Sequence, residues 1–199
     1  GIDFGTANPY CCLWGAWDPA TGICYVYREA YQRNLTAAQQ AAQVKEMSKQ
    51  SNGRFENITA TAIDPSTYSN TSGMGTTVAG VYNSLGVHVV RAKNARVSGW
   101  QNVRRYLQPA PLTGEPKLRV FNTCENLIRT LPAMRHAKVQ VEDIDTDDED
   151  HAVDALRYLL ACRPYNDISR KPKVSLPGAE GKVQKFIDRL DKSAKKRRW

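Results

Sequence analysis

Three aspartates stand where a carboxylate is unusual. Asp3 interrupts the apolar opening GIDFG, Asp64 ends the β-branched run NITATAID, and Asp154 lies within the apolar run HAVDALRYLL. An ionised carboxylate buried without a partner costs several kcal/mol, so each of these side chains needs compensation. A divalent cation shared by all three would supply it. Ligation by oxygen favours Mg²⁺ or Mn²⁺, and the scarcity of histidine and lack of paired cysteines disfavour zinc.

Two further residues accompany Asp154. Asp150 and His151 precede it at helical spacings of four and three, which places all three on one helix face. Asp150 is therefore a further candidate metal ligand, and His151 a candidate to orient an attacking water or donate to a phosphate. Simpler interpretations stay open: Asp64 could cap a turn before Pro65, and His151 could be a solvent-facing residue of a first helical turn.

A phosphate-binding interpretation of the opening competes with the metal site. GIDFGT resembles the first phosphate motif of the actin, sugar kinase and Hsp70 ATPases. Those proteins repeat their fold and carry a second Asp-Gly hairpin, which this sequence lacks, and it contains no GxxxxGK[ST] loop. The residues therefore favour the metal site.

The alternation of strand and helix signals predicts how the aspartates are positioned. YCCLWGAWD and GICYVYREAY read as a β-hairpin around Asp18–Gly22, followed by a helix capped by Thr36 and stopped at Asn52-Gly53. A strand over residues 57–64, a helix at TTVAGVYNSLG and a short strand at HVVRAK come next. A basic helix over Ala95–Leu107, the strand KLRVFN, the helix CENLIRTLPAMRH, the acidic loop EDIDTDDED and the helix HAVDALRYLL complete the order.

This order predicts a ribonuclease H-like α/β fold. We expect a mixed sheet of five or slightly more strands, an antiparallel meander followed by parallel strands, flanked by helices. In that fold the first and fourth strands are neighbours. Asp3 and Asp64 would then meet at the carboxyl ends of strands, where open α/β sheets bind ligands.

Charge indicates a polyanionic partner. The 199 residues carry a net charge of +8, which favours nucleic acid over a membrane surface. Candidate phosphate contacts follow the short strand and line the next helix; they are Arg91, Lys93, Arg96, Arg104 and Arg105. Trp100, in the same helix, is expected in the core.

Composition and cysteine usage narrow the class further. A chain with 41% hydrophobic residues can bury one sizeable core, and no apolar run approaches the roughly 20 residues of a membrane span. No secretory signal is evident, which predicts a cytosolic protein. The five cysteines have no CxxC spacing and are expected to be reduced core residues. We expect one domain over residues 1–163 and a linker with a basic tail over residues 164–199.

Several stretches together resemble a known family. GIDFGTANPY, YREAY, AIDPS, RAKNARVSGWQNVRRYL, VFNTCENLIRTL and, above all, DEDHAVDALRYLL are similar in this order to the C-terminal nuclease domain of the large terminase subunit of tailed bacteriophages. The resemblance covers nearly the whole chain. Unlike a complete large subunit, this sequence has no Walker-type ATPase region before the nuclease.

The resemblance implies an activity and its partners. It implies a ribonuclease H-like endonuclease that cuts concatemeric viral double-stranded DNA in the host cytoplasm with Mg²⁺ or Mn²⁺, by two-metal hydrolysis. Asp3, Asp64 and Asp154 would be the metal ligands. In the full-length motor the implied partners are an N-terminal ATPase domain, the small terminase subunit and the portal, and the isolated domain would be a monomer. A Holliday-junction resolvase-like nuclease and a noncatalytic DNA-binding module remain alternatives.

Overall fold

A computed structural model of the chain describes residues 1–69, 75–111, 113–135 and 149–163. The chain divides into two units, Gly1–Asn166 and Asp167–Trp199, and all the described residues lie in the first. The predicted linker and basic tail and most of the acidic loop fall outside the described residues. The domain boundary after residue 163 therefore stays a prediction.

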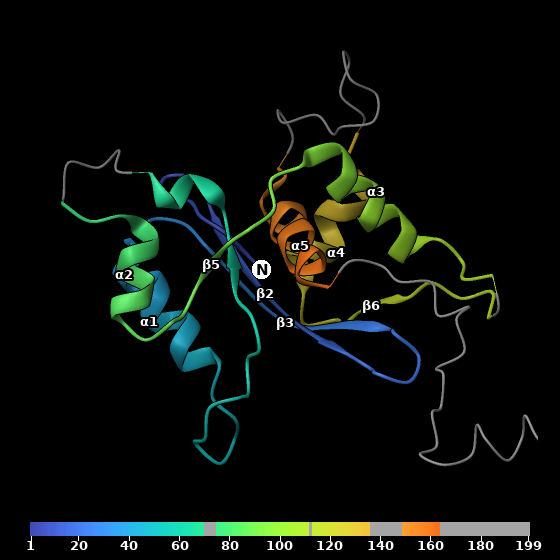
Figure 1. Cartoon of the computed structure of the whole chain (residues 1–199), viewed down its shortest axis with the longest axis horizontal. Coiled ribbons are helices and arrows are strands. Elements are labelled where there is room, and N and C mark those ends of the chain that lie inside the picture. Colours follow the sequence, from blue (N-terminus) through green and yellow to red (C-terminus); the bar gives the residue numbers. More distant parts are fainter. Residues whose placement is uncertain (70–74, 112, 136–148, 164–199) are drawn as a thin grey trace, which may run out of the picture. The chain divides into compact units, whose positions relative to one another are not determined.

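A six-stranded mixed sheet forms the centre of the first unit, with strand order β5-β4-β1-β2-β3-β6 (Figure 1). The first three strands make an antiparallel meander, while β4 pairs parallel with β1, β5 with β4, and β6 with β3. The strands are β1 Ile2–Asp3, β2 Tyr10–Trp17, β3 Cys24–Gln32, β4 Ala62–Ile63, β5 Val90–Arg91 and β6 Leu118–Val120. The predicted fold class is confirmed, including the neighbouring positions of the first and fourth strands.

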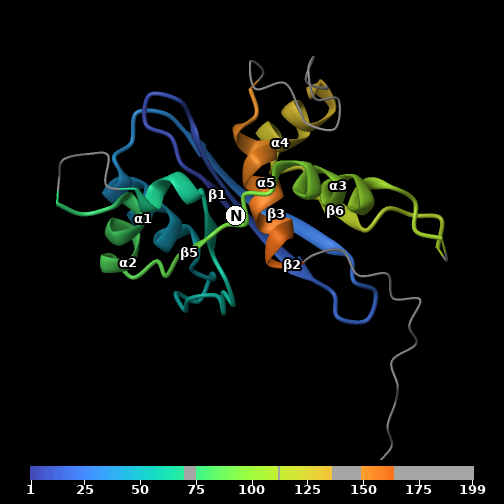
Figure 2. The same ribbon diagram turned by 45° about the horizontal axis from the view of Figure 1, so that its top comes forward.

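Helices cover both faces of this sheet. The bounds are α1 Ala37–Met47, α2 Val78–Ser84, α3 Arg96–Leu107, α4 Glu125–Thr130 and α5 His151–Cys162, with 3₁₀ turns η1 Pro65–Tyr68 and η2 Leu131–Ala133. Figure 2 shows α1 and α2 on one side of the sheet and α3, α4 and α5 on the other. The helix α5 packs across β1, β2 and β4 and against α3.

The alternation of side chains along β2 builds a core on each face. Tyr10, Cys12 and Trp14 belong to the core under α1 and α2, whereas Cys11 and Leu13 belong to the core under α3, α4 and α5. This is the period-two pattern of a strand buried on both faces. On β1, Ile2 joins the α1 and α2 core. Asp3, the next residue, therefore faces α5.

Local chemistry explains most element boundaries. Thr36 caps α1 with a full capping box to Gln39, as its sequence predicts. In the β2–β3 turn the Asp18 carboxylate accepts from Ala20 N and from the Thr21 hydroxyl, and Gly22 adopts φ +71°. Trp100 is buried, as expected.

Three expectations were wrong. The helix α1 ends at Met47, well before Asn52-Gly53, because the Ser48 hydroxyl donates to Val44 O and accepts from Trp14 Nε1, after which the chain turns back. Of residues 57–64 only Ala62 and Ile63 are strand, because only they lie between partner strands that are themselves two residues long.

Cys162 is the third exception, since it is exposed while the other four cysteines are buried. It lies at the last position of α5, beyond the part of the helix that the sheet covers. Among the described residues, no helix has the length and apolarity that a membrane span requires.

Candidate metal centre

Asp3 and Asp64 lie at the carboxyl ends of adjacent parallel strands. Ile2 pairs with Ile63, and Asp64 N donates to Ile2 O at 3.0 Å, so the two aspartates follow the same rung of the sheet. The Asp64 carboxylate also accepts from Ser66 N at 2.8 Å and caps η1. The turn-cap interpretation of Asp64 is thus confirmed. It does not exclude a second role, because the charge of Asp64 is close enough to raise the pKa of Asp3.

The start of α5 brings a histidine and two acids to the same place. Asp3 and Asp154 are each only 8% exposed. His151 Nδ1 lies 3.1 Å from Asp3 Oδ2 and 3.9 Å from Asp150 Oδ1. The sequence-predicted acids and His151 therefore gather at one end of the sheet, drawn from β1, the end of β4 and the first turn of α5.

Burial sets the electrostatics of this cluster. Desolvation raises the pKa of Asp3 to about 7; the hydrogen bond to His151 opposes this, and repulsion by Asp154 and Asp64 adds to it. Burial, reinforced by repulsion from Asp154, also raises the pKa of Asp150. The pKa of His151 is raised chiefly by its hydrogen bond to Asp3. Near neutral pH these groups hold protons that a bound cation would replace.

Two arginines neutralise Asp154. Arg157 Nε donates to Asp154 Oδ1 at 3.0 Å, and Arg96 Nη1 lies 3.9 Å from Asp154 Oδ2. Arg157 is only 1% exposed. Sequence reasoning missed Arg157, although a lone basic residue three positions after Asp154 in an otherwise apolar helix was a usable signal.

Glu149 anchors the start of α5, and this link was also missed. Its carboxylate accepts from both terminal nitrogens of Arg129 at 2.7 Å and from the hydroxyl of Tyr31. These bonds, Arg129 first, lower the pKa of Glu149 to about 2. Because Glu149 directly precedes Asp150 and His151, the anchor fixes where those side chains begin. The partners are distant in sequence, so no local pattern revealed them.

The predicted DNA contacts fall into two groups. Arg91 is paired in register with Ile63, one residue before Asp64, and its guanidinium stacks 4.8 Å above the Tyr68 ring. Arg91 and Lys93 are exposed, and Arg96 opens α3 beside Asp154.

Arg104 and Arg105 lie in the last turn of α3, away from the carboxylates. That end of the helix is marked by Tyr106, whose hydroxyl donates to Arg163 O just beyond α5. Contact of all five basic residues with DNA stays a prediction.

The acids have the donor chemistry of a hard cation site without being assembled into one. Among the described residues, no three His, Cys, Asp or Glu side chains are arranged closely enough to hold a metal ion. The donors are nevertheless carboxylate oxygens, the ligands that Mg²⁺ and Mn²⁺ prefer. The raised pKa of Asp3 shows that the protein itself does not fully compensate this charge. The residue types therefore fit a divalent cation.

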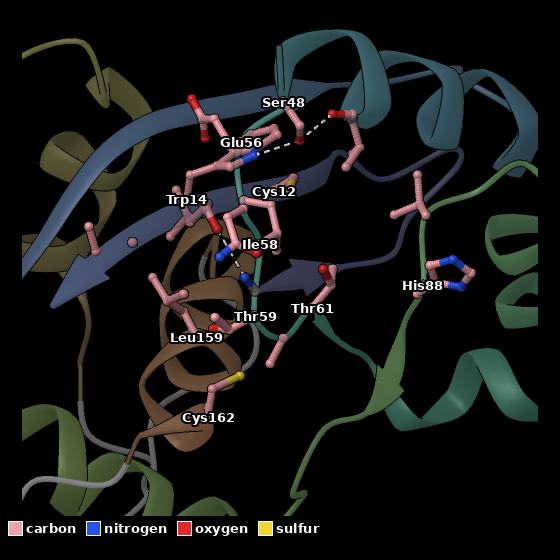
Figure 3. Close-up of a pocket in the computed structure, with 18 of the residues that line it drawn as sticks. Cys12, Trp14, Ser48, Glu56, Ile58, Thr59, Thr61, His88, Leu159 and Cys162 are labelled. Carbon is pink, nitrogen blue, oxygen red and sulfur yellow. Dashed lines mark hydrogen bonds between the residues drawn. The ribbon is translucent and has the colours of Figure 1, made fainter. Parts of the chain in front are cut away.

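A cavity of about 1170 Å³ lies elsewhere, at the opposite end of β1. Figure 3 shows Trp14, Thr61, Leu159 and Cys162 around it, and Gly1 also lines it. None of the predicted site residues does. The chemistry expected from the sequence therefore belongs to the carboxylate cluster and not to this hollow.

Comparison with known proteins gives one family. Residues 1–162 match the model of the terminase RNaseH-like domain. No match was found among curated protein sequences.

Solved structures share the fold. The nuclease domain of the P22 large terminase is 23% identical with a TM-score of 0.63, and the match covers 81% of this chain and 78% of that one. The large terminase of a thermophilic bacteriophage, in complex with ATP-gamma-S, is 19% identical with a TM-score of 0.59, covering 79% and 37%. The large-terminase nuclease domain of bacteriophage SPP1, with bound Mn, is 16% identical with a TM-score of 0.52, covering 80% and 82%.

Proposed function

The chain belongs to the family of terminase RNase H-like domains, and on this basis we propose that it is a divalent-metal-dependent endonuclease that cuts concatemeric viral double-stranded DNA during genome packaging. The observation that carries the proposal is the gathering of Asp3 and Asp64 at the ends of β1 and β4 with Asp154 from α5. Three buried or half-buried carboxylates at a strand-end site are costly unless they hold a cation.

Asp3, Asp64 and Asp154 would hold Mg²⁺ or Mn²⁺, two ions in all, with Asp150 as a further contributor. Such ions activate a water and stabilise the leaving oxygen of a phosphodiester. The Mn bound by the SPP1 nuclease domain supports this choice of metal. Asp3 must give up its proton to act as a ligand, and His151, 3.1 Å from its Oδ2, orients the carboxylate and can accept that proton.

The basic residues would hold the DNA backbone. Arg91 and Lys93 are exposed beside the end of β4, and Arg96 lies between them and Asp154. Contacts with phosphates give affinity without sequence readout and weaken as salt rises. This fits cuts made with little sequence preference.

We place this activity in the packaging motor, in the host cytoplasm. The ATP-gamma-S complex of a large terminase, which this chain matches over 37% of its length, supports an ATPase domain as partner. The small terminase subunit and the portal are further proposed partners, with the basic segment 164–199 as a candidate portal or DNA contact. The isolated domain is expected to be monomeric.

Nicking of supercoiled plasmid tests the proposal. We expect cleavage with Mg²⁺ or Mn²⁺, no cleavage in excess EDTA, and loss of cleavage in Asp154→Asn. Asp18→Asn, which changes an exposed carboxylate in the β2–β3 turn, is the matched control and should cut normally. Undiminished cleavage in EDTA would refute the metal-dependent mechanism.

The two alternatives give other results. Preference for four-way junctions over linear duplex, together with a dimeric mass, would indicate a resolvase-like nuclease. Metal-independent DNA binding without any cleavage would indicate a noncatalytic module.

A further inference from the structure

We propose that Arg157 is a positioning residue that fixes the orientation of the Asp154 carboxylate in the candidate metal centre. This inference rests on the proposed function, because it assigns a role to Arg157 at the same site. Arg157 lies in the middle of α5, three residues after Asp154, and is buried at 1% exposure.

The hydrogen bonds of Arg157 commit it to Asp154. Its Nε donates to Asp154 Oδ1 at 3.0 Å. Within the described part of the chain, its two terminal nitrogens are buried and have no hydrogen-bond partner. If the Asp154 carboxylate turned away, a buried guanidinium would lose its acceptor, and an unpaired buried charge is strongly destabilising. The pairing therefore holds the carboxylate in one orientation.

Arg157 is itself held in place by its surroundings. Its guanidinium lies 4.5 Å from the centre of the Tyr158 ring and 5.5 Å from that of Trp100. A methyl group on Gly99 of α3 would come within 2.9 Å of Arg157 Cγ and Cδ. The aromatic rings stabilise the cation, and the close approach of α3 at Gly99 fixes its methylene chain.

The consequence is a division of labour between the two oxygens of Asp154. Oδ1 is taken by the buried Arg157, whereas the contact of Oδ2 with Arg96 is longer, at 3.9 Å, and Arg96 is 30% exposed. Arg96 can therefore move toward solvent or a phosphate, while Arg157 cannot. Oδ2 is the oxygen left for a cation, and Arg157 determines that it is this one.

A matched pair of substitutions isolates the hydrogen bond. Arg157→Gln places an amide nitrogen where Nε stands and can still donate to Asp154, while Arg157→Met places a methyl group there. Both remove the charge and the two unpartnered terminal nitrogens. Any difference between them therefore reports on the hydrogen bond, because charge and chain length are matched.

The measurement is Mn²⁺ affinity, from the electron paramagnetic resonance signal of the free ion, with plasmid nicking as a second readout. Outer contacts that orient a metal ligand are typically worth 10- to 100-fold in affinity or activity, so we expect Arg157→Met to bind Mn²⁺ about tenfold more weakly. Arg157→Gln should stay within about threefold of wild type. Val103→Ala, which removes buried volume from the same helix interface without touching Asp154, controls for lost stability and should bind Mn²⁺ normally.

Each other outcome has a definite meaning. Equal loss in the Gln and Met variants would show that Arg157 acts through its charge, and would overturn the positioning role. Unchanged affinity in both, with a lower melting temperature, would leave Arg157 a packing residue. If wild-type protein fails to bind Mn²⁺, the proposed metal centre itself is refuted. Should Arg157→Met not fold, the comparison of Arg157→Gln with Gly99→Ala, which displaces the intact guanidinium, decides: positioning requires weaker Mn²⁺ binding in Gly99→Ala.

Discussion

Replacing Asp3 with asparagine should change how the stability of the metal-free protein depends on pH. The native pKa of Asp3 is about 7, against an ordinary value of 3.8. A carboxyl group whose pKa is raised by folding contributes stability that is fully present below its unfolded pKa and is lost as the pH rises through its folded pKa. For Asp3 this contribution is therefore present below about pH 4 and is lost as the pH passes about 7.

The raised pKa of Asp3 corresponds to about 4 kcal/mol across the full range. Between about pH 5 and about pH 8.5, where the unfolded carboxyl is already ionised, the loss is about 3 kcal/mol. His151 adds a change of the same sign, because its pKa is also raised, chiefly by Asp3. An asparagine side chain at this position would neither ionise nor retain the charge that raises the pKa of His151. We therefore expect Asp3→Asn to remove most of this pH dependence and to be the more stable protein at pH 8.5.

Urea unfolding followed by circular dichroism, in EDTA at constant ionic strength, measures the effect. Asp18→Asn is the control, because the pKa of Asp18 is lowered by its bond from Thr21 and the group stays ionised over this pH range. If Asp3→Asn loses stability between pH 5 and pH 8.5 as steeply as wild type, Asp3 is not the buried, uncompensated carboxylate described above. Adding Mn²⁺ at pH 8.5 should stabilise wild type but much less Asp3→Asn.

Two further predictions concern the neighbouring strands. Asp64→Asn keeps the cap on Ser66 N but removes a charge; it should abolish Mn²⁺-dependent nicking, leave the metal-free melting temperature equal or higher, and shrink the rise on adding Mn²⁺, whereas wild-type cutting by this variant would reduce Asp64 to a turn residue. Arg91→Gln and Lys93→Gln should each weaken binding to any duplex sequence and lower the slope of log affinity against log salt by about 1, measured by fluorescence anisotropy; an unchanged slope would remove that residue from the DNA interface.

The sequence predicted the parts of this domain that local chemistry determines. The Asp18–Gly22 turn, the Thr36 cap and the β-branched run before Asp64 are local signals, and together they placed Asp3 beside Asp64 correctly. The fold order followed from the sequence of these elements. The gathering of the candidate acids was therefore predictable, although their function as ligands still awaits the tests above.

Contacts between distant segments were not predictable in the same way. Charged residues are rarely buried, so Arg157 was not expected under α3, and only the ring contacts and the Asp154 pairing explain its position. The link from Tyr31 to Glu149 joins segments 118 residues apart. The early end of α1 depends on a hydrogen bond from Trp14 to Ser48, which no helix-stop rule contains.

The two cores on opposite faces of the sheet give the protein separate optical reporters. Trp14 belongs to the core under α1 and α2, whereas Trp100 lies under α3 and α5 and Trp17 packs against that same core. Indole emission depends on its immediate surroundings, so each tryptophan reports on its own layer. A Trp14→Phe protein would keep reporters on the side of the carboxylates within the described residues. Its emission could then distinguish loosening of α5 alone from unfolding of the whole domain, by comparison with the far-ultraviolet signal of the backbone.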